Sequence, residues 1–312
     1  MTQIVCGVDV SKARLDACLL PGDVFASFDN SPEGIAQLAG FCTAAGAELV
    51  VMEASGGYER QPYLLLWDAG IACALVNARQ VRCYAQAMGA LEKTDRIDAH
   101  MIARFANAKG LAPEPPPSKA QQHLRALVGR LGQVTGDLTV NKQRRSSATH
   151  PAAIASLDQT IAFLKRQSKA LETEIAAMID EDPLWACLAE AWRTVKGVAG
   201  RTIARLLAQA PELGLRTNKA IAKTVGLAPI ADDSGARTGQ RHIRGGRAGV
   251  RSILFLVAEI ARRYDPGLAD FHKKLIDAGK PKMVARIALA RKLLVRLNAK
   301  AREARANFAA AT

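Results

Sequence analysis

The stretch IVCGVDVSK, residues 4–12, decides the fold of the first part of the chain. It is an apolar run typical of a buried strand, yet Asp9 interrupts it and a polar turn follows. A second apolar run, ELVVME, ends on Glu53 before the glycine-rich turn SGGY. A buried carboxylate is costly unless a cation compensates its charge. These acids therefore indicate a site for a doubly charged cation, and Ser55 beside Glu53 is explained by turn chemistry rather than as a nucleophile.

Two further acids, Asp95 and Asp98, are spaced three residues apart in TDRIDAHMIARFA, so both can face one side of a helix that Thr94 would cap. For this pair alone the simpler explanation is preferred, namely acids favoured by the dipole at a helix start. Together with Asp9 and Glu53 they favour Mg²⁺, with Mn²⁺ as the alternative. Hard cations are held by a few carboxylates and by substrate phosphates.

Residues 1–112 are predicted to form one α/β domain. Strand-like runs at 4–10, 16–20, 49–53 and 71–76 alternate with helix-like stretches near 32–45, 59–69 and 78–90. Such alternation predicts a sheet with helices packed on it. The segment APEPPPSK, residues 112–119, ends this domain because consecutive prolines neither continue a helix nor pair in a sheet.

Residues 113–190 change to an apolar spacing of three and four. The apolar positions are Leu124, Leu127, Leu131, Val134 and Leu138, then Ile154, Leu157, Ile161, Leu164, Ser168, Leu171, Ile175 and Met178. This heptad pattern predicts helices over 120–149 and 152–181 that form an antiparallel hairpin or a coiled-coil connector. One hairpin has little of its own to bury against, so a homo-oligomer, a dimer or tetramer, is expected.

The charge is unevenly distributed. The net charge is +14, and residues 191–312 alone carry 25 Lys and Arg against 8 Asp and Glu. This mostly helical third is expected to bind a polyanion, with nucleic acid favoured over a generally basic surface. Six cysteines without CxxC spacing indicate free thiols of a reducing compartment, and no apolar run approaches a membrane span. A cytoplasmic, bacterial-type protein associated with the nucleoid is expected.

Two segments of the basic third are candidate phosphate contacts. VKGVAGRTIA, with Lys196 and Arg201, resembles half of a helix-hairpin-helix, although an ordinary packing turn is equally compatible. The loop 230–249 holds Ser234 and is rich in arginine. Its candidate nucleic-acid-binding residues are Arg237, Arg241, Arg244, Arg247 and Arg251. From the residues alone, this segment is interpreted as a phosphate-binding loop. His242 is interpreted as a surface or phosphate-contacting residue rather than as a proton carrier. The acids Asp232 and Asp233 would need a metal or a basic neighbour in such a loop.

Several motifs in register resemble the IS110/IS1111 family of transposases. GVDVSK (7–12), VMEASGGYE (51–59) and KTDRIDAHMIA (93–103) resemble its RuvC-like DEDD domain. GVAGRTIA (197–204), GLAPIADDSGARTGQRHIRGGRAGVRSILF (226–255) and GKPKMVARIALARKLL (279–294) resemble its second domain.

The resemblance implies an RNase H-like (RuvC-like) α/β fold for residues 1–112 and a mainly α C-terminal domain over 191–312. It also implies that Asp9, Glu53, Asp95 and Asp98 are catalytic Mg²⁺ ligands, and that Ser234 is the nucleophile that forms a transient phosphoserine link to DNA. The implied partners are double-stranded DNA, as element ends and target, and a structured non-coding bridge RNA that pairs with both.

Three alternatives remain open. The nearest is a metal-dependent RuvC-like junction resolvase or nuclease in which Ser234 has no covalent role. A sugar kinase of related fold is disfavoured by the missing second glycine-rich phosphate loop and by the basic last third. A nucleic-acid-binding protein without catalysis is disfavoured by the four carboxylates.

Overall fold

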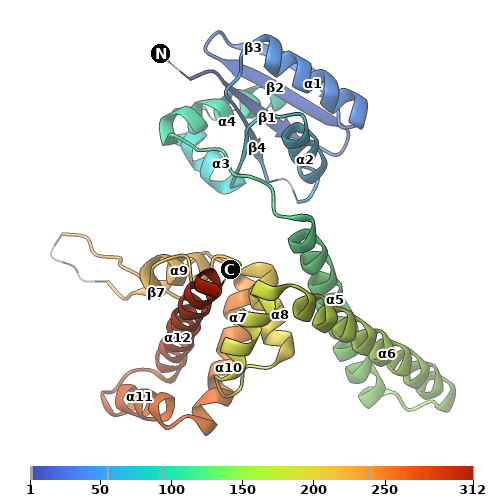
Figure 1. The fold of residues 1–312 in the computed structure, drawn as a ribbon, viewed down its shortest axis with the longest axis vertical. Helices are drawn as coiled ribbons and strands as arrows, with labels where there is room; N and C mark the ends of the chain where they lie inside the picture. The colour runs from blue at the N-terminus through green and yellow to red at the C-terminus, as the bar shows by residue number, and fades with distance from the viewer. Residues whose placement is uncertain are drawn as a thin grey trace. The chain divides into compact units, whose positions relative to one another are not determined.

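The computed structural model describes residues 3–54, 56–90, 92, 94–235, 237 and 239–311. They form two compact units, Met1–Ser118 and Lys119–Thr312 (Figure 1). The expected boundary at residue 112 lies in the same proline-containing segment as the observed one. The further division of the helical remainder at residue 190 stays a prediction.

The first unit is a five-stranded mixed sheet with helices packed on both faces (Figure 1). Its strands lie in the order β3-β2-β1-β4-β5, in which β1 is antiparallel to β2 and parallel to β4. The strands are β1 (Val5–Val10), β2 (Arg14–Leu20), β3 (Val24–Asp29), β4 (Leu49–Glu53) and β5 (Cys73–Val76). The helices are α1 (Pro32–Ala44), α2 (Arg60–Asp68), α3 (Ala78–Ala87) and α4 (Asp95–Lys109). This mixed α/β sheet is consistent with the expected RuvC-like domain.

The two faces of the sheet bury two separate cores, because successive residues of a strand point to opposite sides. In β1, Cys6 and Val8 are buried with α1 and α2, whereas Val5 is buried with α3 and α4. In β4, Met52 joins the first core and Val51 the second. The apolar runs in the sequence are continuous because both faces are covered.

The sequence pattern predicts four of these strands but not β3. Its residues are exposed or half-buried, since β3 lies at the edge of the sheet. The expected free thiols are confirmed: all six cysteines are free, and four of them are buried in this unit.

The second unit begins with a long helical hairpin. Helices α5 (Lys119–Ser147) and α6 (Pro151–Glu181) are joined by three residues and pack against each other, so they are antiparallel (Figure 1). Every predicted heptad position is buried or half-buried, while the outer positions are mostly exposed. The predicted helical hairpin is confirmed, whereas its supercoiling stays a prediction.

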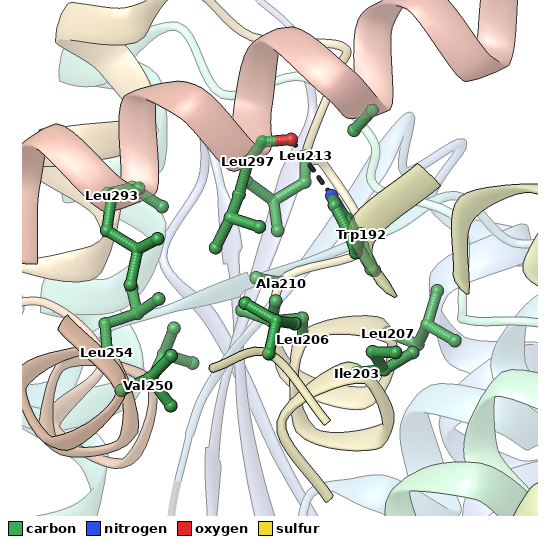
Figure 2. Packing of buried hydrophobic residues seen from close by; sticks show 14 of the residues in the cluster. Trp192, Ile203, Leu206, Leu207, Ala210, Leu213, Val250, Leu254, Leu293 and Leu297 are labelled. Atoms are coloured by element: carbon green, nitrogen blue, oxygen red, sulfur yellow. Dashed lines mark hydrogen bonds between the residues drawn. The ribbon is translucent and has the colours of Figure 1, made fainter. Parts of the chain in front are cut away.

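The rest of this unit is mainly helical, as expected. Its helices are α7 (Pro183–Arg193), α8 (Gly200–Gln209), α9 (Asn218–Val225), α10 (Ala248–Tyr264), α11 (Pro266–Asp277) and α12 (Lys282–Ala311), and β6 (Pro229–Ile230) pairs with β7 (His242–Ile243). Figure 2 shows Trp192 of α7 in the core of this unit, where its indole N–H donates to the Leu297 carbonyl of α12 at 2.9 Å. Leu206 of α8 and Leu254 of α10 are buried in the same core. Within the described residues, no helix is long and apolar enough to cross a membrane.

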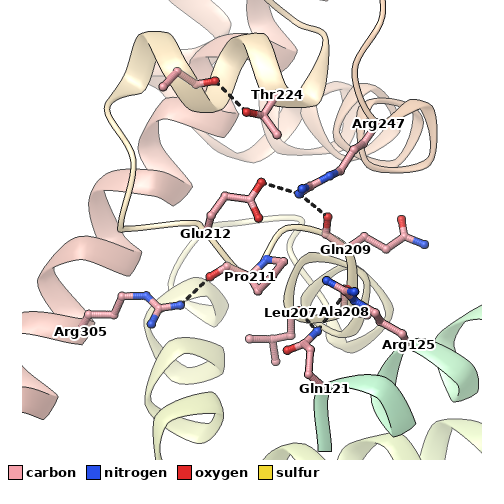
Figure 3. Close-up of polar contacts among 11 residues, drawn as sticks. Gln121, Arg125, Leu207, Ala208, Gln209, Pro211, Glu212, Thr224, Arg247 and Arg305 are labelled. Carbon is pink, nitrogen blue, oxygen red and sulfur yellow. Dashed lines mark hydrogen bonds and ion pairs between the residues drawn. The ribbon is translucent and has the colours of Figure 1, made fainter. Parts of the chain in front are cut away.

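Side chains from distant elements satisfy the carbonyl groups at the end of α8 (Figure 3). Gln121 of α5 donates to the Leu207 and Ala208 carbonyls, at 2.9 and 3.2 Å. Arg125 donates to the Ala208 carbonyl at 3.0 Å, and Arg247 donates to the Gln209 carbonyl at 2.7 Å. The last carbonyls of a helix have no partner within it and carry partial negative charge. These donors therefore tie the hairpin and the start of α10 to the end of α8.

Candidate active site

The register of the sheet brings Asp9 and Glu53 together. β1 and β4 are parallel, with Gly7 paired to Val51 and Val8 paired to Met52. Asp9 and Glu53 are the next residues along these strands, so they lie side by side at the carboxyl ends. Both follow the alternation that points toward α4, because Val5 and Val51 are buried on that face. Asp9 and Glu53, which are 44 residues apart in the sequence, are therefore neighbours on one face of the sheet.

Helix α4 brings Asp95 and Asp98 to the same face. Thr94 caps the helix, since its hydroxyl oxygen accepts from the Ile97 N–H at 3.2 Å, and both acids fall in the first turn. The helix crosses β1 at Gly7, where an added Cβ would lie 2.3 Å from the Ala99 carbonyl oxygen. Glycine therefore permits the close approach of α4 to the strand that carries Asp9.

The electrostatics of Asp9 show that the four acids share one region. Burial, followed by repulsion from Asp98, Glu53 and Asp95, raises the pKa of Asp9 from 3.8 to about 6. Repulsion from neighbouring carboxylates disfavours the charged form of each. A divalent cation reverses this by attracting all of them.

A fifth acid, Asp16, was not predicted from the sequence. It is the cross-strand partner of Asp9 in the antiparallel pair of β1 and β2, and it adds to the rise in the pKa of Asp9. Its carboxylate accepts a hydrogen bond from the Ser27 hydroxyl at 2.6 Å, and that hydroxyl accepts from Arg14 at 2.7 Å. Only the register places Asp16 next to Asp9, so no signal in the sequence pattern marks it.

The donor set fits a hard divalent cation in its chemistry, because it consists of carboxylates that repel one another. The carboxylate side chains are, however, farther apart than the ligands of a bound metal ion would be. Among the residues that the structure describes, no three His, Cys, Asp or Glu side chains are close enough together to hold a metal ion. The assignment of Asp9, Glu53, Asp95 and Asp98 as ligands stays a prediction, and Ser55 lies outside the described residues.

Ser234 lies in the turn of the β6–β7 hairpin and is exposed. Its N–H donates to the Arg237 carbonyl at 3.0 Å, and the Arg237 N–H donates to the Ser234 carbonyl at 2.9 Å. Between them Gly235 has a φ of +55°, in the left-handed region that glycine adopts readily. Asp233 stabilises the base of the turn by accepting from the Gly239 N–H at 3.2 Å and by pairing with Arg241 at 3.8 Å. The acids of this loop therefore include one with the basic neighbour that the sequence analysis required.

The arginines of the loop have different surroundings. Arg237 and Arg244 are exposed on the hairpin and on the segment after it. Arg247 forms an ion pair with Glu212, and Arg251 donates to the Gly245 carbonyl at 2.6 Å. Arg247 and Arg251 therefore hold the fold of their own segment, and phosphate contacts by the arginines of this loop stay a prediction.

The turn between α7 and α8 has a similar mixture of roles. Lys196 is exposed beside Gly197, whose φ is +85°. Arg201 instead pairs with Glu172 of α6 and donates to the Ser168 hydroxyl at 3.1 Å. Arg201 therefore links the helical hairpin to α8, and a phosphate contact by Lys196 and Arg201 stays a prediction.

Comparison with known proteins decides the family. Residues 6–149 match the DEDD transposase model of IS110, and residues 189–273 match the transposase model of the IS116/IS110/IS902 family. The chain belongs to the IS110 family of transposases. The first match includes Asp9, Glu53, Asp95 and Asp98, and the second includes Ser234.

Relatives of this IS110-family transposase include two gene-inverting proteins. It is 26% identical over 307 residues to the pilin gene-inverting protein of Moraxella lacunata, with 94% of each chain covered, and the same holds for the protein of that name from Moraxella bovis. It is 29% identical over 147 residues to an uncharacterized 43.6 kDa protein of the insertion element IS110 of Streptomyces coelicolor, covering 46% of this chain and 35% of the other. An IS110-family transposase acts on DNA, and its DEDD domain implies dependence on a divalent metal.

Proposed function

We propose that this IS110-family transposase cuts and rejoins the DNA strands of an insertion sequence with a metal-dependent carboxylate site and a nucleophilic serine. The observation that carries the proposal is the convergence of Asp9 and Glu53 through strand register with Asp95 and Asp98 on α4. Acids placed in this way repel one another, which lowers the stability of the fold. A bound cation would offset this repulsion because it attracts all of the carboxylates. Mg²⁺, with Mn²⁺ as the alternative, suits their oxygen donors.

The carboxylates would hold the cation, and the protein around them fixes their positions. A bound divalent cation would supply neutralisation of charge on the phosphodiester oxygens and orientation of the attacking group. Asp9 and Glu53 are on rigid strands, and Asp95 and Asp98 are on the capped first turn of α4. Such placement limits the motion of the ligands, which favours a defined geometry for the bound phosphate.

Ser234 provides the covalent step in this proposal. Its Oγ attacks a DNA phosphorus, so that an Oγ–P bond forms and a P–O ester bond of the DNA breaks. The serine proton is transferred in the same step, and the DNA oxygen leaves as a hydroxyl. Attack by a hydroxyl of another strand then reverses the chemistry, joins the new strand and restores the serine. One phosphodiester is broken and one is made, so no external energy source is needed.

Arg237 and Arg244 support Ser234 in this role because guanidinium groups hold phosphate oxygens through paired hydrogen bonds. Exposure of the hairpin turn leaves Ser234 and these arginines accessible to a DNA backbone. A serine hydroxyl needs such electrostatic help because it is a weak nucleophile by itself.

Two features of the proposal rest on the family and not on the geometry. A structured bridge RNA would choose the DNA sequences by base pairing while the protein contacts backbones. A homo-oligomer, a dimer or tetramer, would hold the two DNA partners together.

The alternative function is hydrolysis by a nuclease or junction resolvase with the same carboxylates. The relatives named for pilin gene inversion favour rejoining, since inverting a segment requires that cut strands be joined again. Hydrolysis would leave Ser234 without a covalent role.

A strand-exchange assay tests the carboxylate site. The substrates are a DNA segment that carries the gene with its native flanks and the RNA transcribed from those flanks, with Mg²⁺ present. Asp98→Asn is expected to lower exchange by on the order of 10²-fold or more, because it removes a charged ligand and keeps the shape. Asp68→Asn, an exposed acid at the end of α2, is the matched control and should leave exchange unchanged. Equal activity of the two variants contradicts the proposal.

A further inference from the structure

A groove with a volume of about 800 Å³ lies beside the serine hairpin in the second unit. One wall is formed by β7 and its neighbours, including Arg241 and His242, and another by Phe271 of α11. The floor is a face of α12. A concave site of this size is in the range of ligand pockets in proteins.

Helix α12 is apolar on two faces, which explains why its sequence lacks a clear polar side. Leu289, Leu293 and Leu297 are fully buried in the core. Val284 and Ile287 lie on another face, which lines the groove. Val284 is 50% exposed, although it is a large aliphatic residue. An apolar surface that the fold leaves open is typical of a binding site.

The rim of the groove is basic. Arg241 and His242 of the hairpin and Arg291 and Lys292 of α12 line it, and no described lining residue is an acid. The Lys292 ammonium lies 4.2 Å from the centre of the Phe271 ring, which is a cation–π contact between the rim and the apolar lining of the groove. An apolar floor with a rim that carries three cations, Arg241, Arg291 and Lys292, complements a ligand that is flat, apolar and negatively charged.

We propose that this groove binds an unpaired nucleotide strand, with its bases on the floor formed by α12 and its phosphates on the basic rim. Among nucleic acids, only an unpaired strand presents both features, because base pairing and stacking in a duplex hide the faces of the bases. Proteins that bind single strands combine a cationic groove with aromatic side chains on which bases stack, and Phe271 is such a side chain in this groove.

The groove is connected to Ser234, the candidate nucleophile, through strand β7. Strand β7 lines the groove and is also the strand that leads back from the Ser234 turn. A nucleotide strand bound in the groove would therefore continue toward Ser234. This inference rests on the proposed function of Ser234. Strand exchange passes through unpaired nucleotides next to the cut, and the groove would hold them while they change partners. The proposed occupant is DNA, because the strand next to the cut at Ser234 is DNA, and RNA is the alternative that the test distinguishes.

The test measures binding without catalysis, in full-length protein that carries Ser234→Ala. Val284→Glu adds a negative charge to the floor of the groove at an exposed position, so folding should be retained. Leu256→Glu is the matched control, because Leu256 is a 59% exposed aliphatic residue of α10 outside the groove. The probes are fluorescent oligothymidine, oligouridine of equal length and a DNA duplex, followed by fluorescence anisotropy at fixed salt.

Val284→Glu is expected to weaken binding of a single strand by on the order of tenfold, with a smaller effect on the duplex and none in Leu256→Glu. The probe whose affinity falls further, oligothymidine or oligouridine, identifies the strand as DNA or RNA. A second readout is photocrosslinking of an iododeoxyuridine-containing strand, which should label Phe271 or Met283. Unchanged single-strand affinity in Val284→Glu overturns the proposal. If Val284→Glu changes the sedimenting mass while the single-strand affinity is unchanged, the groove binds a second copy of the chain.

These outcomes are independent of the serine chemistry. Weaker binding by Val284→Glu would stand even if Ser234 formed no covalent link, because every protein in the comparison already lacks that hydroxyl. Failure of the groove would equally leave the role of Ser234 untouched.

Discussion

At the scale of single residues, the central observation is the electrostatic situation of Asp9. It is held in a strand, beside Glu53 and facing the first turn of α4, and its pKa is raised to about 6 by burial and by the neighbouring acids. The folded protein therefore binds a proton at Asp9 more tightly than the unfolded chain does. Without a cation, the ionised carboxylate lowers the stability of the fold.

The sign of this effect gives a pH prediction for Asp9→Asn. Without metal, Asp9 is protonated in both states below about pH 4, so the variant and the wild type should be equally stable there. As the pH rises from about 4 to 6, the wild type loses stability and the variant does not, and above this window the variant should have the higher Tm. The measurement is thermal unfolding in EDTA across this range.

Adding Mg²⁺ should reverse the order, because the cation stabilises only the protein that binds it. Asp68→Asn removes the same charge from an exposed position and serves as the control, with no change in either condition. A lower Tm for Asp9→Asn in EDTA at pH 8 would show that Asp9 is not under repulsion.

Gly7 is the second decisive residue. A Cβ at this position would lie 2.3 Å from the Ala99 carbonyl oxygen and 2.5 Å from the Ala103 nitrogen, so Gly7→Ala should push α4 away from β1. We expect a decrease of about 1–3 kcal/mol in the free energy of unfolding, as for other overpacked sites. Metal-dependent stabilisation should also weaken. Gly40→Ala, in α1 with no atom within 4 Å of the added Cβ, should instead stabilise the fold slightly, and chemical denaturation compares the two.

The site could be predicted in part from the sequence. Asp9 and Glu53 were evident because the first interrupts an apolar run and the second ends one, and these positions do not depend on tertiary detail. Asp16 was not evident, because an acid in a strand marks a site only after the register places it across from Asp9. The different surroundings of Arg237 and Arg247 also follow from distant contacts such as that with Glu212, which no local pattern contains.

At the scale of elements, helices with a strong apolar period were predicted to within a few residues. The hairpin of α5 and α6 is the clearest case, since residues such as Leu124 and Leu164 repeat over several turns. Short or exposed elements were missed: β3 lies at an edge, α9 has eight residues, and β6 and β7 have two residues each. Elements of this size depend on tertiary packing rather than on their own pattern.

The hairpin gives a prediction with a matched control one residue away. Leu164 is 7% exposed in the seam with α5, while Phe163 is 50% exposed on the outside of α6. Leu164→Glu should lower helicity and Tm, because a charge would be buried in an apolar seam. Phe163→Glu should leave both unchanged, as circular dichroism would show.

Sedimentation of the same two variants tests the expected oligomer. A lower mass for Phe163→Glu with unchanged helicity would place the contact between copies on the outside of the hairpin. Equal helicity and Tm for both variants would contradict the assigned seam.

At the scale of the whole molecule, charge and chemistry are divided along the chain. The carboxylates are in the first unit, whose sequence is slightly acidic, whereas the excess of 17 positive charges is in residues 191–312. The basic part is suited to holding DNA backbones, and the acidic part to holding the cation.

The basic part should determine the salt dependence of DNA binding. Replacing Arg237 and Arg244 with Ala should reduce the slope of log K against log salt by about 0.9 for each phosphate that the protein no longer neutralises. Replacing Lys165 and Arg166 of α6 with Ala removes the same charge from the hairpin and should leave the slope unchanged. Titrations of a labelled duplex at several salt concentrations give both slopes, and equal slopes for the two double variants would argue against phosphate binding by the serine loop.

The most direct test of the central claim is a search for the covalent intermediate. End-labelled DNA with the native flanks is incubated with the protein, the RNA of those flanks and Mg²⁺, and then run on a denaturing gel. Ser252→Ala, an exposed serine of α10, is the control for Ser234→Ala. The account predicts a protein-linked DNA band with the wild type and with Ser252→Ala, and neither the band nor strand exchange with Ser234→Ala, although that variant still binds DNA. A linked band or continued strand exchange with Ser234→Ala would contradict it.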